Sequence, residues 1–357
     1  MRLPIQFAKS TLGVSMRFAV LLVASFLAAP ALSAQHVVPS DGQWLIDPSD
    51  HSGRVQLTVR YGEGRYSSNW GRDVPLSELV GLSAADMRGS GTTVHFKIVR
   101  SAGTLTCEGW FEGGRGSGHF TYEPNSDFVA ELAKRGISAP TGWEQFQMTM
   151  AGVGLELVDE LQRQSYDRPT AGELARMATH GVDLEYVRDI GARGYHLKDS
   201  ESLVRMRDHG VDRDFIESLD GAGYKNLSAD QLVRMRDHGV DPDFIASLDS
   251  AGYKNLRTED LVRLRDHGVD GDYIADMKEA GYAPANPEDL VESRDHGVDP
   301  SYIRSLKEAG YGGLSLQQLR RARDHGVTRG FIQRVKARGY GNPSLEEVIR
   351  LRDRGLE

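Results

Sequence analysis

The chain has 357 residues, of which 39% are hydrophobic, so it is long enough and apolar enough to bury a core. It carries 43 basic and 51 acidic residues, a net charge of −8, and this acidic balance disfavours a general nucleic-acid-binding protein. A single cysteine excludes a disulfide scaffold and a zinc site built from cysteines.

An apolar run near the N-terminus is typical of a secretory signal peptide. Residues 18–29 are apolar, follow Arg17, and precede small residues that offer cleavage after Ala31 or Ala34. A transmembrane helix needs about 20 apolar residues, and no later stretch of the chain provides them. We therefore expect export, with no membrane span in the mature chain.

The export segment is expected to cover residues 1–34. Translation could start at Met1 or at Met16, which also opens a good signal sequence. Cleavage predicts a mature N-terminus near Leu32 or Gln35, in the periplasm or outside the cell. Because the removed segment holds three basic residues and no acidic ones, the mature chain would carry a net charge of −11.

Residues 35–124 are predicted to form an antiparallel β domain. Apolar residues alternate with polar ones in four segments, at 55–61, 93–98, 104–111 and 119–122. Glycine-rich turns are expected between them, at 101–103 and 112–118, and one or two helical turns at 76–88. Cys107 falls on the apolar side of its segment, which predicts a small buried side chain rather than a nucleophile.

A 29-residue period dominates the rest of the chain. The tripeptide His-Gly-Val recurs at this spacing, beginning at His180, His209, His238, His267, His296 and His325. The dipeptide Gly-Tyr recurs in the same register, at Gly194, Gly223, Gly252, Gly281, Gly310 and Gly339. Self-similarity at this period is typical of a solenoid. Weaker copies upstream and downstream extend the array to residues 125–357, about eight periods.

Each period is predicted to hold two short helices. The first begins at a capping residue such as Ser228, with Gln231 three places on, and ends at the glycine of His-Gly-Val. The second begins at the aspartate after that valine, as at Asp241, and ends at the glycine of Gly-Tyr. The fold class is therefore predicted as α+β, an N-terminal antiparallel β domain followed by an α-solenoid of about eight 29-residue helix-turn-helix repeats.

The repeated Arg-Asp-His-Gly-Val-Asp string is the main candidate for chemistry. Histidine beside aspartate suggests a metal or acid-base site, but equivalent helices of adjacent repeats lie about 8–10 Å apart, which is too far for consecutive histidines to share one ion. The preferred interpretation is that the ring caps helix carbonyls or meets the negative end of the helix dipole. As a binding surface, the candidates are His209, His238, His267, His296, His325, Arg207, Arg236 and Arg265. No metal and no cofactor are predicted.

Charge is expected to separate within the array. Arginines gather on the first helices and acids at the start of the second helices, which predicts one basic and one acidic rim. Arginine and aspartate three residues apart, such as Arg234 and Asp237, are expected to form solvated ion pairs along one helix. The alternative is that arginine and aspartate pair across repeats, which is favoured over a dedicated anion groove.

The repeat resembles one found in exported bacterial proteins of uncharacterised function, and the string at residues 232–253 carries the resemblance. Similar arrays trail antirepressor metallopeptidases of the beta-lactam-sensing type, and residues 102–111 resemble the sheet module that precedes such arrays. This chain lacks the zinc motif and the membrane helices of those peptidases, so no catalytic residue carries over. The resemblance implies a sensor or interaction region.

Two classes of function remain open. The leading hypothesis is a non-catalytic periplasmic or secreted scaffold that binds a protein or a cell-envelope component through the solenoid surface. The alternative is an enzyme or small-ligand receptor with a pocket in the β domain or at its junction with the array. For that pocket the candidates are Trp70, Trp110, Trp143, His119 and Asp127.

Overall fold

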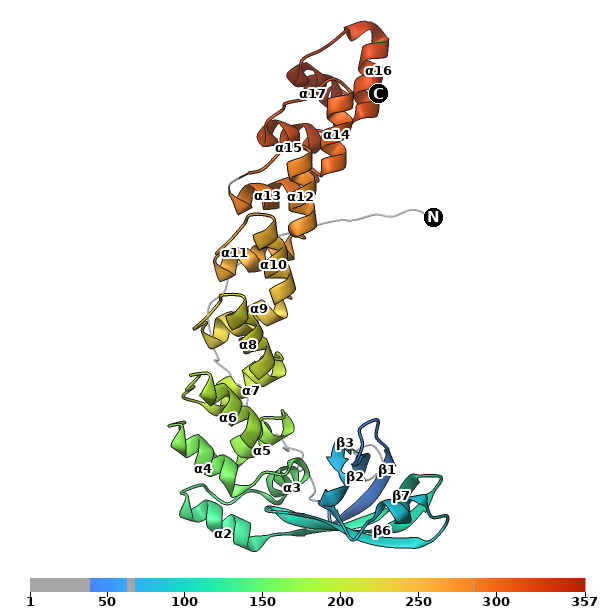
Figure 1. The fold of residues 1–357 in the computed structure, drawn as a ribbon, viewed down its shortest axis with the longest axis vertical. Helices are drawn as coiled ribbons and strands as arrows, with labels where there is room; N and C mark the ends of the chain where they lie inside the picture. The colour runs from blue at the N-terminus through green and yellow to red at the C-terminus, as the bar shows by residue number, and fades with distance from the viewer. Residues whose placement is uncertain (1–38, 63–67, 285, 357) are drawn as a thin grey trace, which may run out of the picture. The chain divides into compact units, whose positions relative to one another are not determined.

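A computed structural model describes residues 39–62, 68–284 and 286–356 of the chain. The expected signal peptide at residues 1–34 lies outside these described residues. An antiparallel sheet is followed by sixteen described helices, so the α+β class is confirmed (Figure 1). None of the helices in the described ranges is long and apolar enough to cross a membrane.

The N-terminal sheet has seven strands in the described part of the chain. They are β1 (Asp41–Pro48), β2 (Arg54–Tyr61), β3 (Ser68–Pro75), β4 (Leu79–Val80), β5 (Thr93–Arg100), β6 (Gly103–Glu112) and β7 (Arg115–Pro124). Their order in the sheet is β3-β2-β1-β7-β6-β5-β4, and every neighbouring pair is antiparallel. A 3₁₀ turn at Leu76–Glu78 and helix α1 (Ala84–Arg88) confirm the helical turns predicted between strands.

The four predicted strands are confirmed, but β1, β3 and β4 were not predicted, and β4 lies within residues 76–88, where only helical turns were expected. Strand β3 is an edge strand that, among the described strands, pairs only with β2. Its one fully buried hydrophobic side chain is Val74. In β1 only Trp44 and Ile46 are buried. Both strands are held by backbone hydrogen bonds to their neighbours, which leave little trace in the pattern of apolar residues.

The predicted glycine-rich turn at 112–118 is wrong for most of its length, since β7 begins at Arg115. A Cβ atom at Gly116 would lie 2.5 Å from the Phe111 ring, and one at Gly109 would lie 2.4 Å from the Trp44 ring. These glycines therefore let two aromatic rings lie directly on the sheet backbone. The Trp44 ring also packs edge-on to Phe96, with centroids 5.0 Å apart.

Helix α3 (Gly142–Ala151) belongs to the cores of both the sheet and the helices. Its Phe146 and Met150 pack with the buried residues of the sheet, while Met148 packs with those of the helices. The Gln145 amide donates hydrogen bonds of 2.9 Å to the carbonyls of Ala102 and Asn125. The sheet and the helices thus share this helix in their cores.

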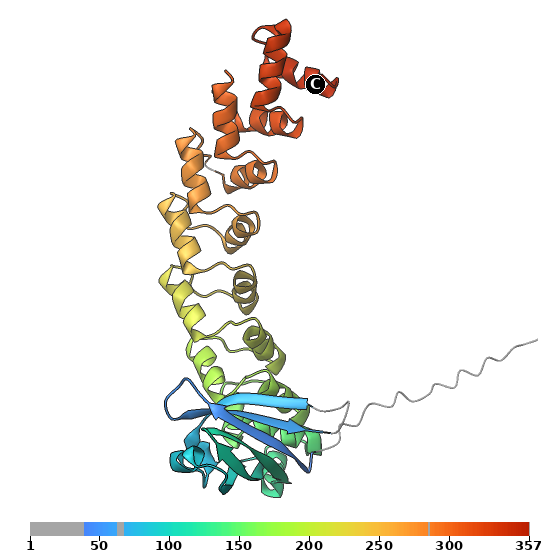
Figure 2. The same ribbon diagram turned by 90° about the vertical axis from the view of Figure 1, so that its right-hand side faces the viewer.

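The helices after the sheet are of two alternating kinds. First helices are α3, α5 (Ala171–Thr179), α7 (Ser200–Asp208), α9 (Ala229–Asp237), α11 (Thr258–Asp266), α13 (Pro287–Asp295), α15 (Leu316–Asp324) and α17 (Leu345–Asp353). Second helices are α2 (Ser126–Lys134), α4 (Leu155–Arg163), α6 (Leu184–Ala192), α8 (Arg213–Gly221), α10 (Pro242–Ser250), α12 (Gly271–Glu279), α14 (Pro300–Glu308) and α16 (Arg329–Val335). Helices of one kind in successive repeats contact each other, as α7 contacts α9 and α10 contacts α12 (Figure 2).

The predicted helix boundaries are confirmed by the caps. Ser228 accepts a hydrogen bond from the backbone N–H of Gln231, whose side chain accepts from the backbone N–H of Ser228. Asp241 caps α10 by accepting from Phe244, and Pro242 occupies the first helical position. Such caps satisfy N–H groups that have no partner inside the helix.

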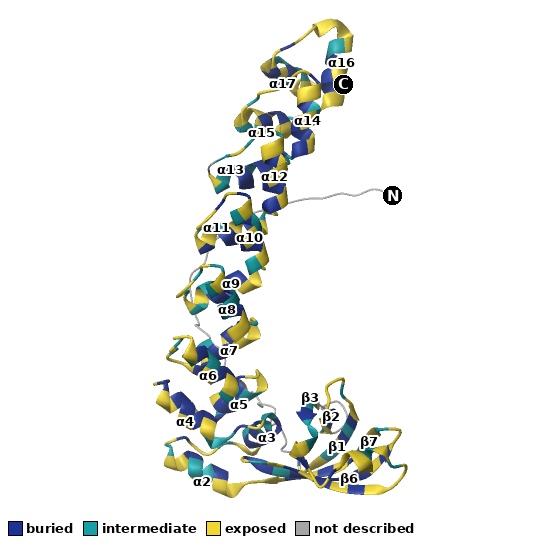
Figure 3. Ribbon diagram, viewed as in Figure 1, coloured by how far each residue is buried: buried dark blue, intermediate teal, exposed yellow. Residues whose placement is uncertain are grey.

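The apolar positions of the two helices in a repeat form a shared core. Leu232, Met235, Val240, Phe244 and Leu248 of one repeat are all less than 5% exposed. Figure 3 shows buried residues on both kinds of helix and along the strands. Helices of nine residues are marginal alone, so this shared burial stabilises them. Cys107 lies buried in the sheet, which raises the pKa of its thiol to about 12.

Candidate functional site

The His-Gly-Val string forms the turn between the two helices of each repeat. His238 is the C-terminal cap of α9, and Gly239 follows with φ of +66°. The Val240 N–H donates to the Met235 carbonyl at 2.9 Å, and the Gly239 N–H donates to the Arg236 carbonyl at 3.1 Å. This pair of hydrogen bonds is the Schellman motif, which ends the helix and buries the valine.

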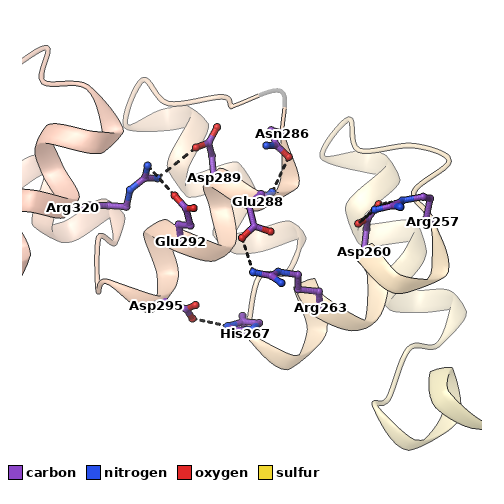
Figure 4. A network of polar contacts seen from close by, with 10 residues as sticks. All are labelled: Arg257, Asp260, Arg263, His267, Asn286, Glu288, Asp289, Glu292, Asp295 and Arg320. Atoms are coloured by element: carbon purple, nitrogen blue, oxygen red, sulfur yellow. Dashed lines mark hydrogen bonds and ion pairs between the residues drawn. The ribbon is translucent and has the colours of Figure 1, made fainter.

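Each histidine ring contacts the next repeat rather than its own helix. The Nδ1 atom lies 2.6–2.7 Å from an aspartate Oδ1, in the pairs His180–Asp208, His209–Asp237, His238–Asp266, His267–Asp295, His296–Asp324 and His325–Asp353. The expected capping of carbonyls by the ring is therefore replaced by a carboxylate contact. Each of these aspartates is the last residue of its helix, where the negative end of the helix dipole disfavours a carboxylate. The imidazole of the preceding repeat lies beside this carboxylate. Figure 4 shows the pair His267–Asp295.

The paired histidines are separate contacts between successive repeats. Their side chains are 35–44% exposed, and each ring has a single aspartate partner. Within the described ranges, no group of three or more His, Cys, Asp or Glu residues is placed to hold a metal ion. These histidine–aspartate pairs therefore link each repeat to the next at an exposed edge of the helices.

In six first helices, the arginine just before the terminal aspartate stacks on an aromatic ring of the preceding repeat. The guanidinium carbon lies 4.8–5.1 Å from the ring centroid in the pairs Arg207–Tyr186, Arg236–Phe215, Arg265–Phe244, Arg294–Tyr273, Arg323–Tyr302 and Arg352–Phe331. Cation–π contacts of this kind contribute about 0.5–1 kcal/mol at exposed sites. Arg207, Arg236 and Arg265 were predicted as binding residues, but their aromatic partners, which always precede them by 21 residues, were not predicted.

In four first helices a second arginine also pairs across repeats, as the alternative interpretation held. Ion pairs link Arg176–Glu201 at 2.8 Å, Arg205–Asp230 at 2.6 Å, Arg263–Glu288 at 2.5 Å and Arg321–Glu346 at 2.9 Å. The expected pairs within one helix are therefore wrong, since the aspartates bind histidines instead. This pairing neutralises part of the predicted basic rim and leaves the stacked arginines unpaired among the described residues.

Figure 4 shows a pair of residues that depart from the usual charge pattern of the first helices. Glu292 stands where other first helices carry arginine, and Arg320 stands where others carry valine. The side chain of Arg320 is 16% exposed, and its Nη2 lies 3.0 Å from Glu292 Oε2. The two departures compensate, because a mostly buried guanidinium needs a nearby carboxylate.

Replacing His238, His267 and His296 together by asparagine should leave the fold intact. An exposed ion pair contributes about 0–1 kcal/mol, and an asparagine amide can still donate to the aspartate. We expect a small fall in melting temperature that shrinks in 0.5 M NaCl, measured by circular dichroism against the parent chain. Elemental analysis of untagged protein should find no stoichiometric zinc, nickel or copper. Tight metal binding that this variant loses would instead make the histidine row a metal site.

Two buried tyrosines at the start of second helices give a pH dependence of stability. Tyr273 and Tyr302 donate hydrogen bonds to the carbonyls of Val298 and Val327, and burial raises the pKa of each phenol to about 12. An unfolded phenol titrates near 10. The stabilisation is thus complete below pH 10 and is lost as the pH rises from about 10 to 12.

Urea unfolding at pH 9 and at pH 11 should show this loss of stability. The matched variant is Tyr273→Phe, because Phe244 occupies the same position in another repeat. It should lose about 0.5–1.5 kcal/mol at pH 9 through its hydrogen bond and should show a shallower decline above pH 10. Equal slopes for parent and variant would contradict a raised pKa at Tyr273.

A cavity lies where the repeat pattern is broken beside the sheet. Residues 151–154 read Ala-Gly-Val-Gly, whereas later repeats have His-Gly-Val-Asp, so a ring and a carboxylate are missing. The cavity has a volume of about 180 Å³ and is lined by these residues with Arg72, Ser101, Glu156 and Asp183, among others. Arg72 reaches to 4.0 Å from Asp183 across it.

The residues proposed for a junction pocket do not gather there. Trp143 packs on Tyr61 with centroids 5.7 Å apart, and Trp70 lies beneath the Arg100 guanidinium. Trp110 is 52% exposed on the outer face of the sheet, and His119 on the same face pairs in register with Glu108. Asp127 is exposed in the first turn of α2. None of these five candidates lines the cavity.

The chain was compared with known proteins. No protein-family model matches it, and no curated protein sequence matches it significantly.

Proposed function

We propose that the chain is an exported, non-catalytic scaffold whose helix pairs form a solenoid and bind a protein or cell-envelope component. The observation that carries the proposal is the sixfold repetition of one surface unit, a stacked arginine beside a histidine–aspartate pair. Such repetition favours a partner that extends over several repeats rather than a compact substrate. The apolar segment at residues 18–29 supports export.

The stacked arginines are suited to contact a partner. All six are exposed, and none forms a hydrogen bond or ion pair through its side chain with another described residue. Stacking restricts the side chain, so less conformational entropy is lost when its N–H groups meet an acceptor. The partner we propose therefore presents carbonyl or carboxylate oxygens along an extended surface.

Photo-crosslinking in the producing cell tests this surface. A photoreactive residue replaces Arg234, which is exposed on α9 near the stacked row, and in a control it replaces Thr106, which is exposed on the sheet. We expect an adduct from position 234 only, and its loss when Arg207, Arg236 and Arg265 are changed to Gln. Equal adducts from both positions, or an adduct that survives the triple change, would overturn the proposal.

A second candidate function follows from the cavity at residues 151–154, which fits a receptor for a small polar ligand. The variant Ala151→His with Gly154→Asp restores the residues of the other repeats and fills the cavity. It should keep or gain stability, since an aspartate cap contributes about 0.5–2 kcal/mol. Thermal-shift screening with amino acids, dicarboxylates and sugars should show a ligand for the parent and none for this variant. A ligand that stabilises both equally, or no ligand for the parent, would remove this candidate.

A further inference from the structure

The exposed face of the second helices changes sign along the array. On α8, α10 and α12 this face carries eight acids and only two bases, Arg213 and Lys278. The acids are Asp214, Glu217, Asp220, Asp243, Asp249, Asp272, Asp276 and Glu279, all exposed or half-buried. We call these residues the acidic half-face. The acidic half-face agrees with the predicted acidic rim, but it covers only these three helices.

The same face on α14, on α16 and on the π-helical turn Lys336–Tyr340 that follows α16 is basic, so the predicted acidic rim extends only over α8, α10 and α12. Its bases are Arg304, Lys307, Arg329, Arg334, Lys336 and Arg338, and its one acid is Glu308. We call these residues the basic half-face. The sign changes at equivalent positions, since Asp220 and Asp249 align with Lys307 and Lys336 in the 29-residue register.

The helices within each half-face contact one another. Helix α8 contacts α10, α10 contacts α12, and α14 contacts α16. Where the two half-faces meet, the residues just after α12 and the side of α14 line one shared depression, which includes Tyr282 and Lys307. Figure 2 shows these helices following one another along one side of the array.

Most of these charges have no partner among the residues that the structure describes. Among the described residues, seven of the eight acids form no ion pair or side-chain hydrogen bond, the exception being Glu217, which pairs with Arg193 and Arg213. In the basic half-face, Arg329 pairs with Glu308 and Lys336 donates to the Ala309 carbonyl. No carboxylate partner occurs in the described ranges for Arg304, Lys307, Arg334 or Arg338. Unpaired like charges on neighbouring helices repel one another, so each half-face favours an external partner of opposite charge.

We propose that a second copy of this chain covers the face, with the two copies antiparallel about a two-fold axis near α12 and α14. In this arrangement the acidic half-face of each copy meets the basic half-face of the other. A two-fold interface uses the same patch on both partners, so the patch must be complementary to itself, and a face with separated opposite charges meets that requirement. A purely anionic partner would neutralise only the basic half-face.

Variants that reverse the charges can be built from residues that occur at the equivalent positions of other repeats. The first variant carries Asp220→Lys, Asp249→Lys and Asp276→Arg, and the second carries Arg304→Glu, Lys307→Asp and Arg334→Asp. Each new residue occurs at the equivalent position of another repeat, as Lys336, Arg334, Glu217 and Asp249 do. Loss of folding is therefore not expected, and circular dichroism checks it.

Sedimentation velocity of the full mature chain measures the association. We expect the parent to be a dimer at micromolar concentration in 50 mM NaCl and to dissociate at least tenfold more readily in 500 mM NaCl, because salt screens the charges. Each variant alone should be monomeric, and an equimolar mixture of the two should form a dimer again. A parent that is monomeric at both salt concentrations, or a mixture that stays monomeric, would overturn the proposal.

Two controls distinguish the dimer from a membrane-bound monomer and from the proposed scaffold surface. A monomeric parent that cosediments with vesicles containing anionic lipid would assign the basic half-face to a membrane surface and overturn the dimer. The photo-crosslink from position 234 lies on a first helix, so the charge-exchange variants should leave it unchanged. Loss of the dimer and loss of the crosslink are thus distinguishable results.

Discussion

Replacing Gly239 with valine should lower the free energy of unfolding by about 1–2 kcal/mol or more. Gly239 has φ of +66°, the left-handed conformation that ends α9. A Cβ atom there would lie 3.7 Å from Arg265, so space is available and the cost comes from backbone strain. Gly268 has the same φ, and its replacement by valine should have the same effect. Urea denaturation followed by circular dichroism measures the loss.

Gly221 provides the matched control for this prediction. It is the last residue of α8, its φ is not positive, and an added Cβ atom would meet nothing within 4 Å. Gly221→Ala should therefore stabilise the chain by about 0.5–1 kcal/mol, since alanine is the better helix former. Unchanged stability in both valine variants would refute the assignment of these glycines as helix ends.

Replacing Trp44 with alanine should cost about 3–5 kcal/mol and unfold the sheet before the helices. Trp44 is fully buried, packs on Phe96 and Phe111, and its Nε1–H donates to the Glu108 carbonyl at 3.2 Å. Alanine would leave a cavity in the centre of the sheet and would remove the hydrogen bond to the Glu108 carbonyl. The buried cluster of the helices does not include Trp44, so most of the helical circular dichroism should persist.

Trp110 is the control for the tryptophan prediction, because it is on the same sheet but 52% exposed. Trp110→Ala should change the stability by about 0.5 kcal/mol or less. Near-ultraviolet circular dichroism reports the aromatic packing of the sheet, and thermal melting at 222 nm reports the helices. Simultaneous loss of both signals in the Trp44 variant would show that the sheet and helices unfold as one unit.

The sequence by itself determined the helix boundaries, because the interactions that set them are local. Ser228 and Asp241 cap helices through N–H groups three residues away, and Gly239 ends a helix through carbonyls of its own last turn. Each of these effects acts within one turn of backbone, so residue type and spacing are sufficient to predict it. The 29-residue period then repeats the prediction along the array.

Only the tertiary structure decided which side chains meet. The partners of the repeated arginine and histidine lie 21 and 28 residues away, as in Arg236–Phe215 and His238–Asp266, and the sequence offered nearer candidates such as Asp237. Likewise, glycines of β7 resemble a turn until the rings of Phe111 and Trp44 are placed on them. A contact between repeats depends on how neighbouring helices stack, and charges share one face only once that stacking is formed. Packing between repeats therefore decided the polar surface, whereas local backbone chemistry decided the helices.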